Sequence, residues 1–219
     1  MQIKRDFQAY IFDFDGVIVD SEPLHAVAKQ NTLDEFLIKY PQELFSDFKG
    51  RPDIDFFDFV SKELAQGKVT PEELGAYKQN EYVKLFEDVA LVPGIQDFIR
   101  FSRKQVKKLG LATSATGRDF SLAANKYQLH TWFDVIITGD DTIKHKPDPE
   151  PFLKAIAKLS VPVDKILVIE DSPNGMKSAK AANCIVAAIT TSFTPTELHL
   201  AGADLVVTSF SELEHELKS

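Results

Sequence analysis

Near its start the chain reads Gln8-Ala9-Tyr10-Ile11-Phe12-Asp13-Phe14-Asp15-Gly16-Val17. The apolar run predicts a buried strand over residues 8–13. Gly16 permits a sharp turn directly after the acidic residues. At a strand end, the carboxylates of Asp13 and Asp15 can enter the same crevice, where one attacks a substrate and the other moves a proton. Taken alone, the stretch fits an acidic pair in a solvated turn equally well.

Five more short apolar runs follow in the second half of the chain, each succeeded by a helical pattern. They cover residues 109–113, 134–138, 165–169, 184–189 and 204–207. Strands that alternate with helices in this way predict a parallel sheet with helices on both faces. The expected fold class is therefore α/β, with a doubly wound, Rossmann-like core.

The segment between the first strand and residue 88 has no clear strand pattern. Apolar side chains recur at helical spacing in two places: Phe36, Leu37 and Tyr40, and Phe56, Phe57, Val60 and Leu64. Thr70 and Pro71 predict a helix start, with Thr70 as the N-cap. The segment reads as a helical insertion, placed where ligands bind in open α/β folds, beyond the carboxyl ends of the strands.

Polar side chains follow the ends of three of the later strands. The run Thr113-Ser114-Ala115-Thr116-Gly117 offers hydroxyl and N–H donors to an anion such as phosphate. Lys146, in a proline-restricted loop, would offset negative charge gathered there. Glu170 and Asp171 would repel the acids of the first strand unless a cation lay among them, and hard oxygen ligands favour Mg²⁺. Taken singly, the Ser and Thr residues also fit a helix N-cap, and the lysine also fits a solvated loop.

Composition limits the possible functions. The 219 residues carry 25 Lys and Arg against 33 Asp and Glu, which gives a net charge of −8. Because the basic residues are dispersed, the balance disfavours nucleic acid as a partner but allows a small anionic ligand. The single cysteine, Cys184, lies in an apolar run and is expected to be a buried, inert thiol. No signal peptide or membrane span is recognisable, so a cytoplasmic protein without membrane partners is expected. A monomer is compatible with the sequence, which leaves the oligomeric state open.

Together and in this order, the four motifs resemble those of the haloacid dehalogenase superfamily, over essentially the whole chain. The resemblance implies an α/β core of residues 1–18 and 89–219 and an all-helical cap domain of residues 19–88. It also implies that Asp13 is the nucleophile that forms an aspartyl-phosphate. Asp15 would be the general acid/base and Lys146 the charge-neutralising lysine. The implied phosphate-binding residues are Thr113, Ser114 and Lys146, and the implied Mg²⁺ site comprises Asp13, Asp15 (through its carbonyl), Glu170 and Asp171.

Asp15 also indicates the type of reaction within this resemblance. Members that cleave carbon–halogen bonds lack this second carboxylate, so phosphoryl transfer is favoured. Residues 20–25, Asp-Ser-Glu-Pro-Leu-His, resemble the group that contains β-phosphoglucomutase and small sugar-phosphate phosphatases. This implies substrate roles in the cap for His25, Lys78 and Arg51. Arg51 is offset from the position of the mutase's cap arginine. A phosphatase of a small phosphorylated metabolite, such as a sugar phosphate, is therefore favoured over a mutase, and a non-catalytic phosphate-binding relative is less favoured.

Overall fold

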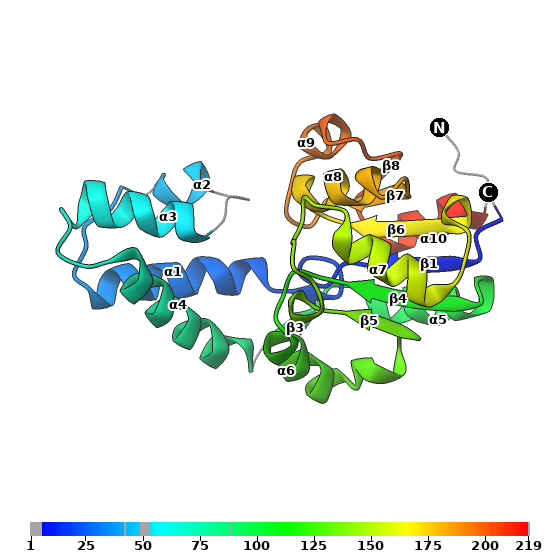
Figure 1. Ribbon diagram of the computed structural model, residues 1–219, viewed down its shortest axis with the longest axis horizontal. Helices are drawn as coiled ribbons and strands as arrows, with labels where there is room; N and C mark the ends of the chain where they lie inside the picture. Colours follow the sequence, from blue (N-terminus) through cyan, green and yellow to red (C-terminus); the bar gives the residue numbers. More distant parts are fainter. Residues whose placement is uncertain (1–5, 42, 49–52, 88, 219) are drawn as a thin grey trace. The chain divides into compact units, whose positions relative to one another are not determined.

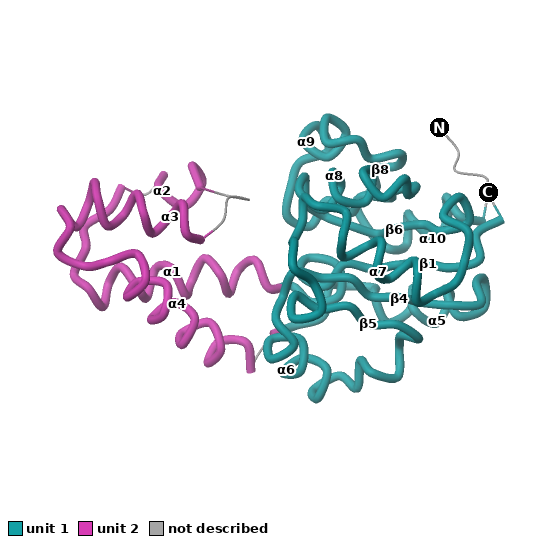
Figure 2. The backbone as a smooth tube through the Cα atoms, in the orientation of Figure 1, with its two compact units in different colours: residues 1–20, 90–219 teal, residues 21–89 magenta. Residues whose placement is uncertain are grey.

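A computed structural model describes residues 6–41, 43–48, 53–87 and 89–218 of the chain. It divides into two compact units, residues 1–20 with 90–219 and residues 21–89 (Figure 2). The chain leaves the first unit and re-enters it beside a small antiparallel pair, β2 (Val19–Asp20) and β3 (Ala90–Leu91). None of the helices in the described ranges is both long and apolar enough to cross a membrane.

The first unit is built on a six-stranded parallel sheet with the order β5-β4-β1-β6-β7-β8 (Figure 1). Its strands are β1 (Ala9–Phe12), β4 (Lys108–Ala112), β5 (Val135–Ile137), β6 (Ile166–Glu170), β7 (Ile185–Ile189) and β8 (Leu205–Val207). These are the six strands that the apolar runs predict. The predicted α/β class and doubly wound core are confirmed.

Alternate residues of β1 face opposite sides of the sheet, as the pleat requires. Ala9 and Ile11 belong to the buried cluster formed with Phe152 of α7 and Met176 of α8. Tyr10 and Phe12 instead contact the ring of Phe98 in α5. Because β1 is fully buried on both faces, its residues form a continuous apolar run rather than an alternating one.

Helices cover the sheet and follow its strands in turn. They are α5 (Ile95–Gln105), α6 (Gly117–Tyr127), α7 (Glu150–Leu159), α8 (Pro173–Ala181), α9 (Pro195–Leu200) and α10 (Phe210–Lys218), with short 3-10 turns η2 (Leu129–Thr131), η3 (Gly139–Asp141) and η4 (Val163–Lys165). Cys184 lies buried just before β7, as predicted, and burial raises the pKa of its thiol to about 12.

The strand order places β1 at the point where the chain changes direction across the sheet. After β1 the chain adds β4 and β5 on one side, and then β6, β7 and β8 on the other. In doubly wound sheets, ligands bind beyond the carboxyl ends of the strands at this switch point. Asp13 follows β1 there, between the ends of β4 and β6.

The regular elements of the second unit, over its described residues, are all helices. It contains α1 (Glu22–Glu35), α2 (Leu44–Asp47), α3 (Asp53–Phe59), the π-helix η1 (Val60–Leu64) and α4 (Pro71–Phe86). Thr70 caps α4 as predicted: its hydroxyl accepts the N–H of Glu73, whose carboxylate accepts the N–H of Thr70. The predicted helical face of Phe56, Phe57 and Val60 is buried in the core of this unit.

The prediction of a helix from the spacing of Phe36, Leu37 and Tyr40 is wrong. Helix α1 ends at Glu35, and Leu37 takes a left-handed conformation with φ of 52° and is 88% exposed. Phe36 and Tyr40 nevertheless pack against the core of the unit, from a loop rather than from a helix. Apolar spacing correctly marked these two rings as core-facing, but it did not reveal the reversal of the chain between them.

Candidate active site

A buried lysine joins two carboxylates at the carboxyl edge of the sheet. Lys146 comes from the loop before α7, Asp13 follows β1 and Glu170 ends β6. The Nζ atom of Lys146 donates to Asp13 Oδ1 at 2.6 Å and to Glu170 Oε1 at 2.8 Å. These two acids lie 157 residues apart in sequence, yet they share one ammonium because β1 and β6 are neighbours.

The second oxygen of Glu170 binds the loop that begins α8. Glu170 Oε2 accepts the N–H groups of Asp171 at 2.7 Å and Ser172 at 2.8 Å, and the Ser172 hydroxyl at 3.1 Å. Glu170 is fully buried. Both of its oxygens therefore have protein donors, and the residue fixes Lys146 and the following loop in one arrangement.

Asp171 completes a compact acidic group. Asp13, Glu170 and Asp171 each offer a carboxylate oxygen, and these oxygens all lie within 4.8 Å of one another. All three residues are buried. The group holds three acids against the single ammonium of Lys146, so its full ionisation would leave an excess of two negative charges in a buried place.

The pKa values reflect this excess of acids. Burial, and then the charge of Glu170, raise the pKa of Asp13 from 3.8 to about 8, although Lys146 opposes the rise. Burial and the charges of Glu170 and Asp13 also raise the pKa of Asp171 well above its usual value. For Lys146, burial favours the neutral amine, but the carboxylates of Asp13 and Glu170 outweigh it and raise its pKa. The group therefore favours added positive charge.

Mg²⁺ fits this group by charge and by donor type. The candidate ligands are hard carboxylate oxygens, gathered without histidine or cysteine, as Mg²⁺ prefers. Glu170 has both oxygens bonded, Oε1 to Lys146 and Oε2 to backbone N–H groups. Lys146 binds one oxygen of Asp13 and none of Asp171, which instead faces the hydroxyl of Thr191. Asp13 and Asp171 are thus the carboxylates best placed to be ligands.

The other predicted residues of this edge follow the strands β1 and β4. Asp15 is partly exposed and lies in the turn after Asp13, where the N–H of Gly16 donates to the carbonyl of Val19. Thr113 follows β4 and is buried, and its hydroxyl accepts the N–H of Ala115 at 2.9 Å. Ser114 is exposed beside it. These residues lie at the ends of β1 and β4, which are paired strands.

The predicted residues of the second unit form a separate polar cluster there. Lys78 Nζ lies 2.9 Å from His25 Nδ1 and 2.8 Å from Asp53 Oδ2, and Lys29 binds the other oxygen of Asp53 at 2.9 Å. The ring of His25 stacks on Tyr82. Burial and the neighbouring ammonium of Lys78 lower the pKa of His25 to about 3, so this imidazole is neutral near pH 7.

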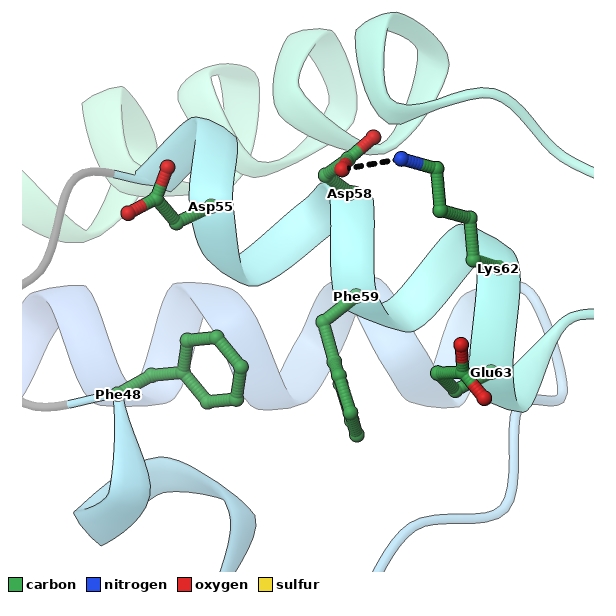
Figure 3. A pocket seen from close by; sticks show the side chains of 6 residues that line it. All are labelled: Phe48, Asp55, Asp58, Phe59, Lys62 and Glu63. Carbon is green, nitrogen blue, oxygen red and sulfur yellow. Dashed lines mark hydrogen bonds and ion pairs between the residues drawn. The ribbon is translucent and has the colours of Figure 1, made fainter.

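Arg51, the third residue predicted to act in the cap, lies outside the described residues. The same unit also has a pocket of about 340 Å³ that contains none of the predicted site residues (Figure 3). Phe48 and Phe59 form its apolar wall, and charged side chains line the rest, including the ion pair between Lys62 and Asp58.

Three residues near the acidic group were not predicted from the sequence: Thr191, Ser192 and Gly175. Thr191 and Ser192 follow β7, and the Thr191 hydroxyl reaches the carbonyl of Gly16. Gly175 lies in α8 against Glu170. A turn composed of threonine and serine is common after a strand, and a lone glycine is no signal by itself. The one available signal was their position: both hydroxyl residues follow β7, the strand next to β6.

We predict that Gly175→Ala disturbs the acidic group. A Cβ at this position would lie 1.5 Å from Glu170 Oε1, the oxygen that accepts from Lys146, so the Glu170 carboxylate would have to shift. The expected loss of stability is about 1–3 kcal/mol, and turnover should fall at least ~10-fold. Thermal unfolding and an activity assay would measure the two effects.

Gly75→Ala is the matched control. A Cβ at position 75 in α4 would meet only Phe57, at an ordinary 3.9 Å, and alanine stabilises a helix interior by roughly 0.5–1 kcal/mol over glycine. The control should keep full activity and gain stability. Equal stability and equal activity of the two variants would contradict the tight packing of Glu170 against Gly175.

Comparison with known proteins places the chain among enzymes. A family model described as haloacid dehalogenase-like hydrolase matches residues 10–189. A phosphorylated carbohydrates phosphatase from Thermotoga maritima is 31% identical over 176 residues, which cover 80% of this chain and 81% of the relative. A β-phosphoglucomutase from Bacillus subtilis is 28% identical over 217 residues, which cover 96% of this chain and 93% of the relative.

A solved structure has the same fold over almost the full length. CbbY from Rhodobacter sphaeroides, determined in complex with phosphate, is 25% identical and has a TM-score of 0.77. The similarity covers 97% of this chain and 100% of that protein. The parallel sheet and the helical unit are therefore features that this chain shares with a known structure.

Proposed function

The chain belongs to the haloacid dehalogenase-like hydrolase family, and we propose that it is a Mg²⁺-dependent phosphatase of a small phosphorylated metabolite, such as a sugar phosphate. The reaction would proceed through an aspartyl-phosphate at Asp13. The observation that carries the proposal is the ammonium of Lys146, which bridges Asp13 and Glu170 at the switch point of the sheet.

Asp13 and Asp15 divide the chemistry. The Asp13 carboxylate attacks the phosphorus atom of the ester and forms an acyl phosphate as the ester oxygen leaves. Asp15 gives its proton to that oxygen, so the leaving group departs as a neutral alcohol. Asp15 then takes a proton from a water molecule, which attacks the same phosphorus atom and releases inorganic phosphate. The Asp13 carboxylate is regenerated.

Lys146, Asp171 and a metal ion would balance the charge of these steps. Lys146 holds the Asp13 carboxylate and is placed to neutralise the oxygens of the arriving phosphoryl group. Asp13 and Asp171, with the backbone carbonyl of Asp15, would hold Mg²⁺, while Glu170 fixes Lys146. When bound, Mg²⁺ supplies the positive charge that lets a dianionic phosphate approach a group of carboxylates.

Thr113 and Ser114 would bind the phosphate oxygens, through the Thr113 hydroxyl and the N–H of Ser114. Residues 21–89 would act as the cap. Within this cap we assign substrate contacts to His25 and Lys78, and to Arg51. Because the imidazole of His25 is neutral and its Nδ1 faces the ammonium of Lys78, its Nε2 carries the proton and is a hydrogen-bond donor.

A sugar-phosphate mutase is the second candidate, and one relative carries the name β-phosphoglucomutase. A mutase must bind a bisphosphate by both ends, which requires cations in the cap that are free to take the second phosphate. In this chain Asp53 already pairs with both Lys29 and Lys78. This pairing favours a monophosphate as substrate, and thus a phosphatase reaction over a mutase reaction.

A phosphorus NMR time course tests the proposal. The protein would be incubated with Mg²⁺ and a panel of hexose, pentose and other small phosphate esters, with and without a chelator. Free phosphate that accumulates from one ester, and only when Mg²⁺ is present, is the expected result. Conversion of a β-hexose 1-phosphate to the 6-phosphate without net phosphate release would establish the mutase instead. No reaction with any ester at saturating Mg²⁺ would refute both.

We predict that Asp15→Ala slows turnover by ~10²–10⁴-fold, the usual contribution of a positioned acid/base group. The loss should be smallest for esters with acidic leaving groups such as p-nitrophenol, because these oxygens need no proton in order to leave. Rates measured on an alkyl phosphate and an aryl phosphate separate the two cases. An equal loss on both esters would remove Asp15 from the role of general acid.

A further inference from the structure

The loop after β7 reaches the turn that carries the acidic residues of the first strand. Thr191 lies two residues beyond the end of β7, and its hydroxyl donates to the backbone carbonyl of Gly16 at 2.6 Å. The same oxygen lies 3.4 Å from Asp171 Oδ2. The contact with Gly16 joins residues 175 positions apart, and together the two contacts connect the ends of β1, β6 and β7.

Ser192 binds Asp171 directly. Ser192 is only 8% exposed. Burial and the charges of Glu170 and Asp13 raise the pKa of Asp171, and a hydrogen bond from the Ser192 hydroxyl opposes this rise. Asp171 is buried and lies beside the negative charges of Glu170 and Asp13. A hydroxyl donor stabilises the ionised carboxylate and fixes its direction without adding an ion that would compete for its charge.

Gly16 is where the two contacts meet. It has a φ of 71°, and a Cβ built on it would lie 1.9 Å from Asp171 Oδ2 and 2.9 Å from the Ser192 hydroxyl. Asp171 and Ser192 therefore pack directly against the backbone of the turn after Asp15. The orientation of Asp171 depends on this packing, because its Oδ2 lies against the backbone of Gly16 and 3.4 Å from the Thr191 hydroxyl.

We propose that Thr191 and Ser192 are positioning residues for the metal: the Ser192 hydroxyl orients Asp171, and the Thr191 hydroxyl holds the Asp15–Gly16 turn against it. This inference rests on the proposed function, since it concerns the same Mg²⁺ site. Hydrogen-bond partners of metal ligands fix the ligand geometry before the ion arrives, and their removal weakens metal binding by roughly 10–100-fold.

Isothermal titration of the metal-free full-length protein with MgCl₂ tests the proposal without any substrate. Ser192→Ala removes the donor to Asp171, and Thr191→Val removes the donor to Gly16 with little change in shape. Each variant should bind Mg²⁺ at least ~10-fold more weakly than the wild type. Thr191→Ser, which keeps the hydroxyl, should retain most of the wild-type affinity for Mg²⁺. Thr196→Val, the same chemical change at an exposed position of α9, is the control and should bind as the wild type does.

The outcomes separate this inference from the function on which it rests. A wild-type protein that binds no Mg²⁺ would refute the proposed metal site itself. Wild-type affinity in both Ser192→Ala and Thr191→Val would refute the positioning role alone. Thermal unfolding in a chelator excludes a general structural effect: the variants should unfold at the wild-type temperature, and a loss of folded protein that accounts for the weaker binding would also overturn the inference.

Discussion

Asp13→Asn abolishes turnover, with a rate at least ~10⁴-fold below that of the wild type, or about 5.4 kcal/mol of barrier. The amide has nearly the shape of the carboxylate but is not a nucleophile, so no acyl phosphate can form. Lys146 keeps its second partner, Glu170, and the fold is retained. Phosphate release from the best ester of the panel measures the rate. Retention of a few per cent of wild-type turnover, in a preparation free of wild-type protein, would remove Asp13 from the role of nucleophile.

The same variant should be more stable than the wild type above about pH 8 when no metal is present. The folded-state pKa of Asp13, about 8, lies above its ordinary value of 3.8. Between these two pH values, the folded protein binds a proton at Asp13 that the unfolded chain does not. Wild-type stability therefore falls as the pH rises from about 4 to about 8, and asparagine removes this loss. Asp164→Asn, at an exposed acid, is the control and should follow the wild type. A wild-type stability that rises across the window in step with the variant would contradict the burial of this charge.

Lys146→Met is the second change with a large expected effect. The Lys146 side chain is 6% exposed and is the ammonium bound by both Asp13 and Glu170. Methionine fills a similar volume but leaves the buried acids without their cation, which costs about 3–5 kcal/mol for a broken buried ion pair. The free energy of unfolding in a chelator should fall by this amount near pH 8. It should fall less near pH 5, where Asp13, with a folded-state pKa of about 8, is protonated instead.

Turnover of Lys146→Met should also be lost, even at saturating Mg²⁺, because Mg²⁺ replaces the missing charge but not the contact to the attacked phosphoryl group. Lys144→Met is the matched control on the same loop. Lys144 is 69% exposed and faces Asp148 at 3.5 Å, so its removal should change stability by less than about 0.5 kcal/mol. Similar losses of turnover and stability in the two variants would show that these losses come from a disturbed loop and not from the missing buried ammonium.

The sequence predicted the sheet because its strands are buried on both faces. Such strands are continuous apolar runs, as residues 184–189 illustrate, and the polar residues that end them mark the carboxyl edge. Parallel strands bring their ends to one edge, so Asp13, Lys146, Glu170 and Asp171 were predicted to meet, and the structure brings them together.

Other features depend on contacts that local patterns do not encode. The reversal at Leu37 requires a left-handed residue that is not glycine, and apolar spacing does not register it. The sequence-based predictions give Asp53 no role, whereas the structure pairs it with two lysines. Thr191 and Ser192 look like ordinary turn residues until the neighbouring strands place them against Gly16 and Asp171.

Chemical trapping of the acyl phosphate tests the central claim most directly. The wild-type protein would be mixed with Mg²⁺ and the best ester of the panel, quenched within one turnover and treated with borohydride, which reduces an aspartyl-phosphate to homoserine. Peptide mass spectrometry should then find homoserine at position 13, and Asp13→Asn should show none. Phosphate release from the same ester without any modification at Asp13, or with the label on another residue, would contradict the mechanism.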